Sequence, residues 1–193
     1  MSQAQQFANP GSLGLWGFAL TTIALSFANA GIIRSVGMTL AYMFFWGGMA
    51  QVLAGWMDFR RGNMLGGTAF STYGLFWIGL GFTLLLHLPV SGGEAGLWMF
   101  LWGVLTLIYA AASANAKAIV LTTVFVLLTI TFELLAAANW TGSAAALHAA
   151  GWMGVITGLD ALYLGAATIL NGTSGRRVLP ERSTAPAFIH VNL

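Results

Sequence analysis

Six apolar stretches, each long enough to cross a lipid bilayer, constrain the fold of this sequence more than any other feature. A helix needs about 20 apolar residues to span a hydrocarbon core of about 30 Å, because each residue adds about 1.5 Å. The stretches are residues 12–31, 36–57, 66–88, 96–113, 117–139 and 144–170. The pattern predicts an all-α integral membrane protein, a six-transmembrane-helix bundle over residues 12–171, with an N-terminal segment at 1–11 and a C-terminal tail at 172–193.

Charged residues make up only 6% of the chain, whereas 58% of it is hydrophobic. A soluble domain carries about a quarter charged residues. Seven Lys and Arg against five acids are too few for a nucleic-acid surface. The absence of cysteine excludes disulfides, thiolate metal sites and thiol nucleophiles, and the three histidines are spread over different segments. We therefore expect membrane lipid around the protein, no metal or other cofactor, and no nucleic-acid partner.

The cationic residues gather on one side of the predicted bundle. That side carries the segments before the first span and after the second, fourth and sixth spans. Its cations are Arg60, Arg61, Lys117, Arg176, Arg177 and Arg182, whereas the opposite side holds Arg34. Because cytoplasmic loops carry the excess of Lys and Arg, both termini should be cytoplasmic. The chain is then a multi-pass protein of the plasma (cell inner) membrane.

The first stretch has an alternative interpretation as a cleaved signal peptide. It ends in Ala28-Asn29-Ala30, which is typical of a cleavage site. However, no Lys or Arg precedes the stretch, and it is longer than a usual signal-peptide core. We therefore favour a membrane helix.

The start of the first predicted helix carries a recognisable motif. Residues 9–18 read NPGSLGLWGF, and the pair Thr21-Thr22 follows. This motif resembles the opening signature of the acetate uptake transporter family, the succinate–acetate permeases, although Gly11-Ser12 stands where that family has Ala-Pro. Further collinear matches cover 8–180: GGMAQ at 47–51, AG at 54–55, GN at 62–63, TAFSTYG at 68–74, FW at 76–77, HAAGW at 148–152 and VLP at 178–180.

The resemblance implies a six-helix protomer with its own pore, assembled as a homo-hexamer, that takes up acetate and similar short monocarboxylates. Whether succinate is carried, and whether protons are coupled, stays open. Position by position, the resemblance gives a hydrophobic constriction of Phe18, Tyr73 and Leu128. It gives Ala161 as a small residue that affects substrate size. The entrance motif is Asn9, Pro10 and Gly14.

Positions along the predicted helices place the three constriction residues and Ala161 about 9 to 17 Å deep, in one slab of the bilayer. Tyr73 would add one hydroxyl to an otherwise apolar neck. A carboxylate also needs donors in place of its water. The candidates are Thr22, Asn29, Gln51 and Thr157. Each has a structural alternative, because threonines bond back to their own helix and an asparagine can cap one.

The helix start at Asn9 and Pro10 is a further candidate, because free amides at a helix N-terminus suit an anion.

Two acids, Glu133 and Asp160, lie within predicted spans. A charged residue at the centre of a membrane helix costs about 2.5 to 3.5 kcal/mol on insertion scales. We therefore hypothesise that one or both are protonated and serve proton coupling. The alternative is a hydrogen-bonded acid at a helix or subunit interface. That alternative is favoured for Glu133, which should face away from Leu128, whereas Asp160 beside Ala161 suits coupling better.

Three other classes of function are open to a membrane helix bundle. A channel for a neutral small solute, such as urea or a short amide, is the main alternative. An intramembrane hydrolase built on Ser143, His148 and Asp160 is disfavoured, because the last two are about three helical turns apart on one span. A sensor or scaffold finds no support in any recognisable soluble module. The protein is therefore not expected to be an enzyme.

Overall fold

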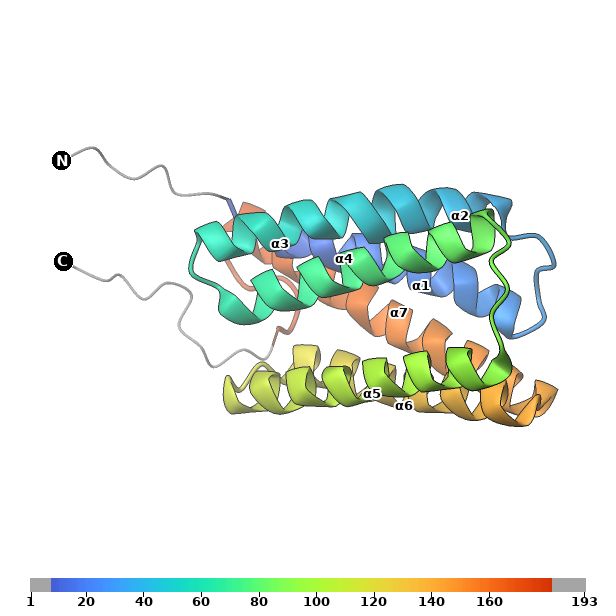
Figure 1. The fold of residues 1–193 in the computed structure, drawn as a ribbon. Helices are drawn as coiled ribbons and strands as arrows, with labels where there is room; N and C mark the ends of the chain where they lie inside the picture. Colours follow the sequence, from blue (N-terminus) through green and yellow to red (C-terminus); the bar gives the residue numbers. More distant parts are fainter. Residues whose placement is uncertain (1–7, 182–193) are drawn as a thin grey trace.

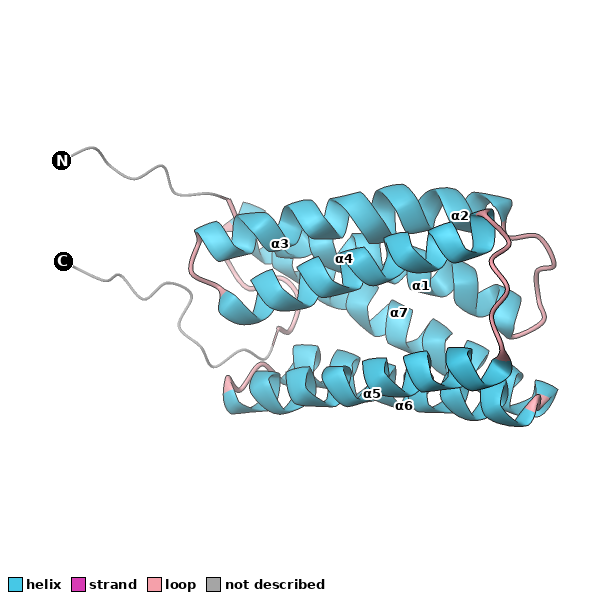
Figure 2. Cartoon of the chain, in the orientation of Figure 1, coloured by secondary structure: helices cyan, strands magenta, loops and turns pink. Residues whose placement is uncertain are grey.

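The computed structural model describes residues 8–181, and these residues form helices joined by short loops (Figures 1 and 2). In chain order the elements are α1 (Gly11–Asn29), α2 (Gly37–Phe44), the π-helix η1 (Phe45–Ala50), α3 (Gln51–Arg60), α4 (Met64–Leu85), α5 (Gly92–Asn115), α6 (Ile119–Thr141) and α7 (Ala144–Ser174). The predicted all-α class is confirmed. Residues 1–7 of the predicted N-terminal segment and residues 182–193 of the predicted tail, Arg182 among them, lie outside the described residues.

Five of these helices, α1, α4, α5, α6 and α7, are long and apolar enough to cross a membrane. The segments α2, η1 and α3 follow one another without a break and occupy the predicted second span. An uninterrupted helix was expected there, whereas the structure has a π-helical turn at Phe45–Ala50. Gly48 in this turn lies close to the Met43 carbonyl oxygen, where an added Cβ would be 2.6 Å away. Such π-turns inside helices often lie at functional sites.

Local side chains explain where several helices begin and end. The side chains of Asn63, Ser91 and Ser143 accept hydrogen bonds from backbone N–H groups in the first turns of α4, α5 and α7. Gly142 and Gly175 end α6 and α7 with φ of 66° and 63°, a left-handed conformation that glycine adopts without strain. These caps coincide with the polar breaks that the sequence predicts.

The bundle has two layers joined by one long helix. In Figure 1 the start of α1 and the end of α7 lie at the same end of the bundle. The run from α2 to α4 packs with α1, and α5 pairs with α6. The backbones of α4 and α5 approach each other in few places, while α7 contacts both α1 and α6. Side chains that point from both layers into the space between them can therefore border a passage along the bundle.

Candidate functional site

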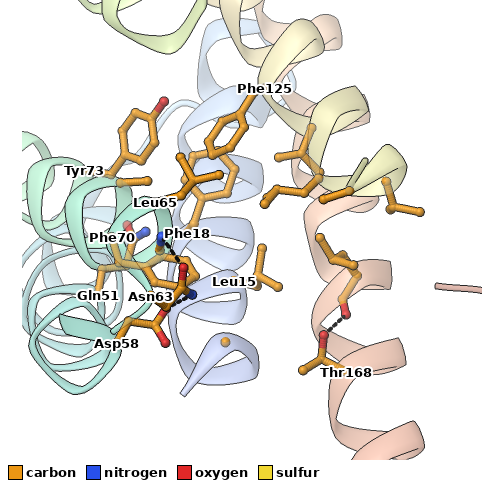
Figure 3. Close-up of a pocket in the computed structure, with 18 of the residues that line it drawn as sticks. Leu15, Phe18, Gln51, Asp58, Asn63, Leu65, Phe70, Tyr73, Phe125 and Thr168 are labelled. Atoms are coloured by element: carbon orange, nitrogen blue, oxygen red, sulfur yellow. Dashed lines mark hydrogen bonds between the residues drawn. The ribbon is translucent and has the colours of Figure 1, made fainter. Parts of the chain in front are cut away.

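Two cavities lie along the bundle between the layers. The near cavity, at the end where α1 begins, has a volume of about 210 Å³ and is drawn in Figure 3. Its outer part is lined by Asn9, Asp58 and Asn63. The far cavity, at the opposite end, has a volume of about 890 Å³ and reaches Asn29 and Asn139. The cavities therefore open toward opposite ends of the bundle.

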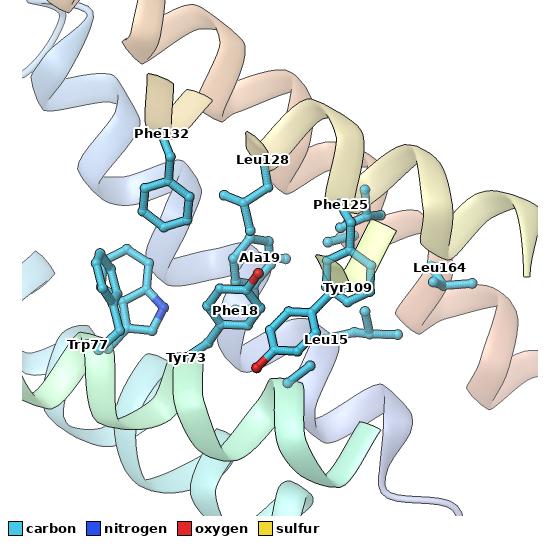
Figure 4. Packing of buried hydrophobic residues seen from close by; sticks show 14 of the residues in the cluster. Leu15, Phe18, Ala19, Tyr73, Trp77, Tyr109, Phe125, Leu128, Phe132 and Leu164 are labelled. Carbon is cyan, nitrogen blue, oxygen red and sulfur yellow. The ribbon is translucent and has the colours of Figure 1, made fainter. Parts of the chain in front are cut away.

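Three of the described residues, Phe18, Tyr73 and Leu128, line both cavities. They come from α1, α4 and α6 and are 5%, 3% and 4% exposed. The ring centroids of Phe18 and Tyr73 are 5.8 Å apart, and Figure 4 shows Leu128 beside them. The structure thus brings together the three residues that the resemblance gave for a constriction. We call these three residues the neck.

The hydroxyl of Tyr73 does not point freely into the neck. It lies 2.8 Å from Oγ1 of Thr106 on α5. Thr106 in turn donates to the carbonyl oxygen of Trp102 at 2.7 Å, so Tyr73 is the donor of the pair. The expected free hydroxyl is therefore occupied, because a buried phenol takes an available acceptor. The neck presents the Tyr73 ring and two apolar side chains.

Aromatic side chains extend the walls on both sides of the neck. Phe125 lines the near cavity, and Phe76, Trp77 and Phe132 line the far one. Sequence reasoning gave these residues no role. Their spacing carries the signal that was missed, since they lie three or four residues from Tyr73 or Leu128 and so share their helix faces. Figure 4 shows Trp77, Phe125 and Phe132 around the neck.

The predicted donors divide between the two sides. Gln51 lines the near cavity, whereas Thr22 and Asn29 line the far one. Gln51 and Thr22 are almost fully buried. Within residues 8–181, the amide oxygen and nitrogen of Gln51 have no hydrogen-bond partner, and the Thr22 hydroxyl has none either. Each cavity therefore has an unpaired polar group on its wall.

Two predicted residues lie in the packing, outside both cavity linings. Ala161 and Thr157 on α7 are both 0% exposed. The Thr157 hydroxyl donates to the carbonyl oxygen of Met153 at 2.9 Å. It also lies 3.2 Å from the hydroxyl of Thr131, a residue that does line the far cavity. A role for Ala161 or Thr157 in the pore therefore stays a prediction.

The entrance motif ties the start of α1 to the end of α3. Oδ1 of Asn9 accepts from the Gly11 N–H and from Nη1 of Arg61, both at 2.9 Å. Arg61 also pairs with Asp58 at 3.4 Å, and the Asn63 side chain donates to Asp58 at 3.0 Å. The Gly11 amide, expected to be free for an anion, is therefore capped by Asn9.

The rest of the motif serves packing. Pro10 is buried, and its carbonyl oxygen accepts from the Gly14 N–H at 3.1 Å. A Cβ added at Gly14 would lie 2.6 Å from the ring of Phe70. Gly14 therefore lets α4 approach α1 just below the neck.

Both intramembrane acids lie outside the cavity linings. Asp160 on α7 accepts from Oγ1 of Thr123 on α6 at 2.7 Å, at the outer face of the bundle. Glu133 lies on α6 against Gly103 of α5, where a Cβ would collide with the carboxylate. Proton coupling through either acid therefore stays a prediction.

The described residues also bear on the hydrolase and metal alternatives. Ser143 caps α7, and His148 lies near Gly31. Asp160 bonds to Thr123, so its carboxylate is not directed at His148. Over residues 8–181, no cluster of three His, Asp or Glu side chains could hold a metal ion.

Comparisons with known proteins give consistent matches. A model of the GPR1/FUN34/yaaH family matches residues 1–183. The succinate-acetate/proton symporter SatP of Escherichia coli K12 is 43% identical over 182 residues, which cover 91% of this chain and 95% of that protein. Ammonia transport outward protein 2 of Saccharomyces cerevisiae is 35% identical over 176 residues, 82% of this chain and 60% of that protein.

A solved structure of the bacterial acetate channel SatP superposes with a TM-score of 0.87 at 43% identity. The match covers 91% of this chain and 99% of that one.

Proposed function

The chain belongs to the GPR1/FUN34/yaaH family, and from that membership we propose that it carries acetate and similar short monocarboxylates across the inner membrane. Its relatives are transporters and channels, so the protein is a multi-pass membrane transporter and not an enzyme. The succinate–acetate relative and the acetate-channel structure support the substrate class.

The proposed route runs from one cavity to the other through the neck. The observation that carries it is that Phe18, Tyr73 and Leu128 line both cavities. An apolar constriction excludes hydrated ions and can close by dewetting. A small acid that sheds its water there needs replacement donors nearby. Gln51 on the near side and Thr22 on the far side are the proposed donors, with Asn29 farther out.

Ala161 and Thr157 are proposed to act on the neck from behind. Both are fully buried in α7, which packs against α1 and α6. A small residue at 161 would let α7 approach those helices closely, so its size would set how far Phe18 and Leu128 stand apart. This would explain an influence on substrate size without direct contact.

The orientation and assembly belong to the same proposal. Six spans with both termini cytoplasmic are supported by the positive-inside bias and by the common end of α1 and α7 in Figure 1. A homo-hexamer, with membrane lipid around it, follows from the resemblance. Native mass spectrometry of the protein extracted with its lipids tests the hexamer, and a reporter fused to either terminus tests the orientation.

Proton-coupled uptake, and succinate as a second substrate, are the finer parts of the proposal. The name of the Escherichia coli relative supports both. Asp160 is the proposed coupling residue and Glu133 the weaker one. Because Asp160 bonds to Thr123 outside the cavities, its protonation would act on the pore by shifting α6 against α7.

A neutral small solute is the second candidate function. The ammonia transporter relative favours it, and so does the charge of the cavities. The described lining residues include Asp58, Glu94 and Glu181 but neither Lys nor Arg. Such walls do not attract anions, so they give acetate no electrostatic advantage over a neutral solute such as ammonia, urea or a short amide.

Flux into liposomes tests the proposal. The purified protein is reconstituted, and uptake of labelled acetate and of labelled urea is measured with and without an inward proton gradient. The proposal expects acetate uptake that other short acids compete away. Urea or ammonia flux that is indifferent to acetate would support the second candidate instead.

A further inference from the structure

Two hydrogen-bond donors on the wall of the far cavity have no partner within residues 8–181. They are Oγ1 of Thr22 and Nε1 of Trp77. Both residues line the far cavity and are only 5% and 4% exposed. Burial of a polar group without a partner is costly, so two such groups at one cavity wall indicate a ligand that pairs with them.

The two donors lie at the same level of the bundle. Thr22 follows Phe18 by four residues on α1, and Trp77 follows Tyr73 by four residues on α4. Both helices run from the near side to the far side, so each donor lies about 6 Å beyond its neck residue. The rings of Phe18 and Tyr73 are 5.8 Å apart. Both donor residues therefore lie on the far side of the neck, on the two helices that carry Phe18 and Tyr73.

The Thr22 hydroxyl lacks a hydrogen bond that three other buried threonines make to their own helices. Thr21, Thr131 and Thr157 each bond to the carbonyl oxygen four residues earlier, at 2.8 to 2.9 Å. That back-bond is the common arrangement for a threonine in a membrane helix. Thr22 makes no such bond, and within residues 8–181 its buried hydroxyl has no partner although the residue lines the far cavity.

The π-turn holds the Trp77 indole in place. A Cβ added at Gly47 would lie 2.7 Å from Cγ of Trp77 and 2.9 Å from Cγ2 of Thr21. Only glycine at this position lets both the indole and the Thr21 side chain lie against η1. Figure 4 shows the indole nitrogen on the ring edge that faces the neck residues in this view.

We propose that the Thr22 hydroxyl and the Trp77 indole N–H form a carboxylate-binding station at the far mouth of the neck. An indole N–H can only donate, so its partner must be an acceptor. A carboxylate offers one oxygen to each donor, and its alkyl group then meets the aromatic wall of Phe76 and Phe132. The station rests on the proposed function and makes Trp77 a specificity-determining residue of it.

Nitrogen-15 NMR on the full-length protein in lipid nanodiscs measures binding at this station directly. The tryptophan indoles are labelled, and sodium acetate is titrated in. The Trp77 resonance, assigned by its loss in Trp77→Phe, should shift saturably. Thr22→Val should weaken the apparent affinity about tenfold, since a hydrogen bond to a charged group is among the stronger ones. Acetamide, with one oxygen, should bind more weakly than acetate.

Two matched controls isolate the donors. Thr21→Val removes a neighbouring hydroxyl that is bonded to its own helix and does not line a cavity. Trp102→Phe removes an indole whose ring lies 5.7 Å from that of Tyr73 but lines neither cavity. Both should keep the affinity within about twofold of the original protein, because neither removes a donor at the station.

The station and the transport proposal fail in different ways. A Trp77 resonance unmoved by saturating acetate, in a protein that transports acetate in liposomes, would overturn the station alone. The same holds if Thr22→Val binds acetate as tightly as Thr21→Val. A protein that binds acetate at Trp77 yet gives no flux would support the station while removing the transport proposal.

Discussion

Tyr73 on α4 donates a hydrogen bond of 2.8 Å to Thr106 on α5, and this bond joins the two layers at the depth of the neck. The backbones of α4 and α5 otherwise meet in few places. The ring that narrows the passage is therefore held in position by a group on the opposite layer.

Replacement of Thr106 by valine should destabilise the protein. The buried Tyr73 hydroxyl would lose its acceptor, so the free energy of unfolding should fall by about 1–3 kcal/mol. Thermal unfolding of the solubilised protein, followed by tryptophan fluorescence, measures the change. Thr129→Val, which loses only a bond to its own helix, is the control. Addition of Tyr73→Phe to Thr106→Val should restore much of the loss; equal stability of the two valine variants would contradict the role of the bond.

Truncation of Leu128 to alanine should widen the neck. Larger acids such as butyrate should then enter faster relative to acetate, because three carbons leave the constriction. Competition of labelled acetate uptake by acids of increasing length in liposomes measures the change. Leu164→Ala, which enlarges the near cavity away from the neck, should keep the original profile. Identical profiles for both variants would remove Leu128 from the route.

Gly151 should tolerate alanine poorly. The new Cβ would lie 2.7 Å from Cα of Ala30 and 2.8 Å from the carbonyl carbon of Asn29; these are backbone atoms that cannot rotate away, and such overpacking costs about 1–3 kcal/mol. Gly79→Ala is the matched control, since nothing lies within 4 Å of a Cβ there. The melting temperature of the solubilised protein should fall for Gly151→Ala and stay near that of the original protein for Gly79→Ala. Equal melting temperatures for the two variants would show that α7 does not pack this closely against the end of α1.

Substitution of Asp160 by asparagine tests proton coupling without disturbing the contact to Thr123, because the amide oxygen still accepts. If Asp160 carries the proton, stimulation of acetate uptake by an inward proton gradient should disappear, while acetate exchange at equal pH stays unchanged. Glu133→Gln should keep the stimulation. A gradient response equal to that of the original protein would exclude Asp160 as the coupling residue.

Much of the fold could be predicted because apolar length and polar breaks determine it. Ser91, Ser143 and Asn63 cap helices at the breaks that the sequence marks. The π-turn could not be predicted, because a glycine pair in an apolar run suits a regular helix equally well. The need for glycine at position 47 follows from a contact with Trp77 on another helix, which the local sequence does not show.

The site could be predicted in part. Depth along a helix placed the neck residues and Ala161 in one slab, but depth gives no direction around the helix axis. In the structure Phe18 faces the cavities, whereas Ala161 lies in the packing between helices, and depth alone could not separate the two. The partner of the Tyr73 hydroxyl lies 33 residues away, so local sequence carried no sign of it. Trp77 could not be predicted either, because the sequence does not show whether the indole nitrogen of a tryptophan in a membrane helix has a hydrogen-bond partner.

The division of the neck between two layers has a mechanical consequence. Phe18 and Tyr73 belong to one layer and Leu128 to the other, with α7 as the main link between them. The aperture is thus a distance between two layers, and a small movement of one layer against the other about α7 would change it. Substitutions where α7 packs against α1 and α6, remote from the passage, should then raise or lower the conductance.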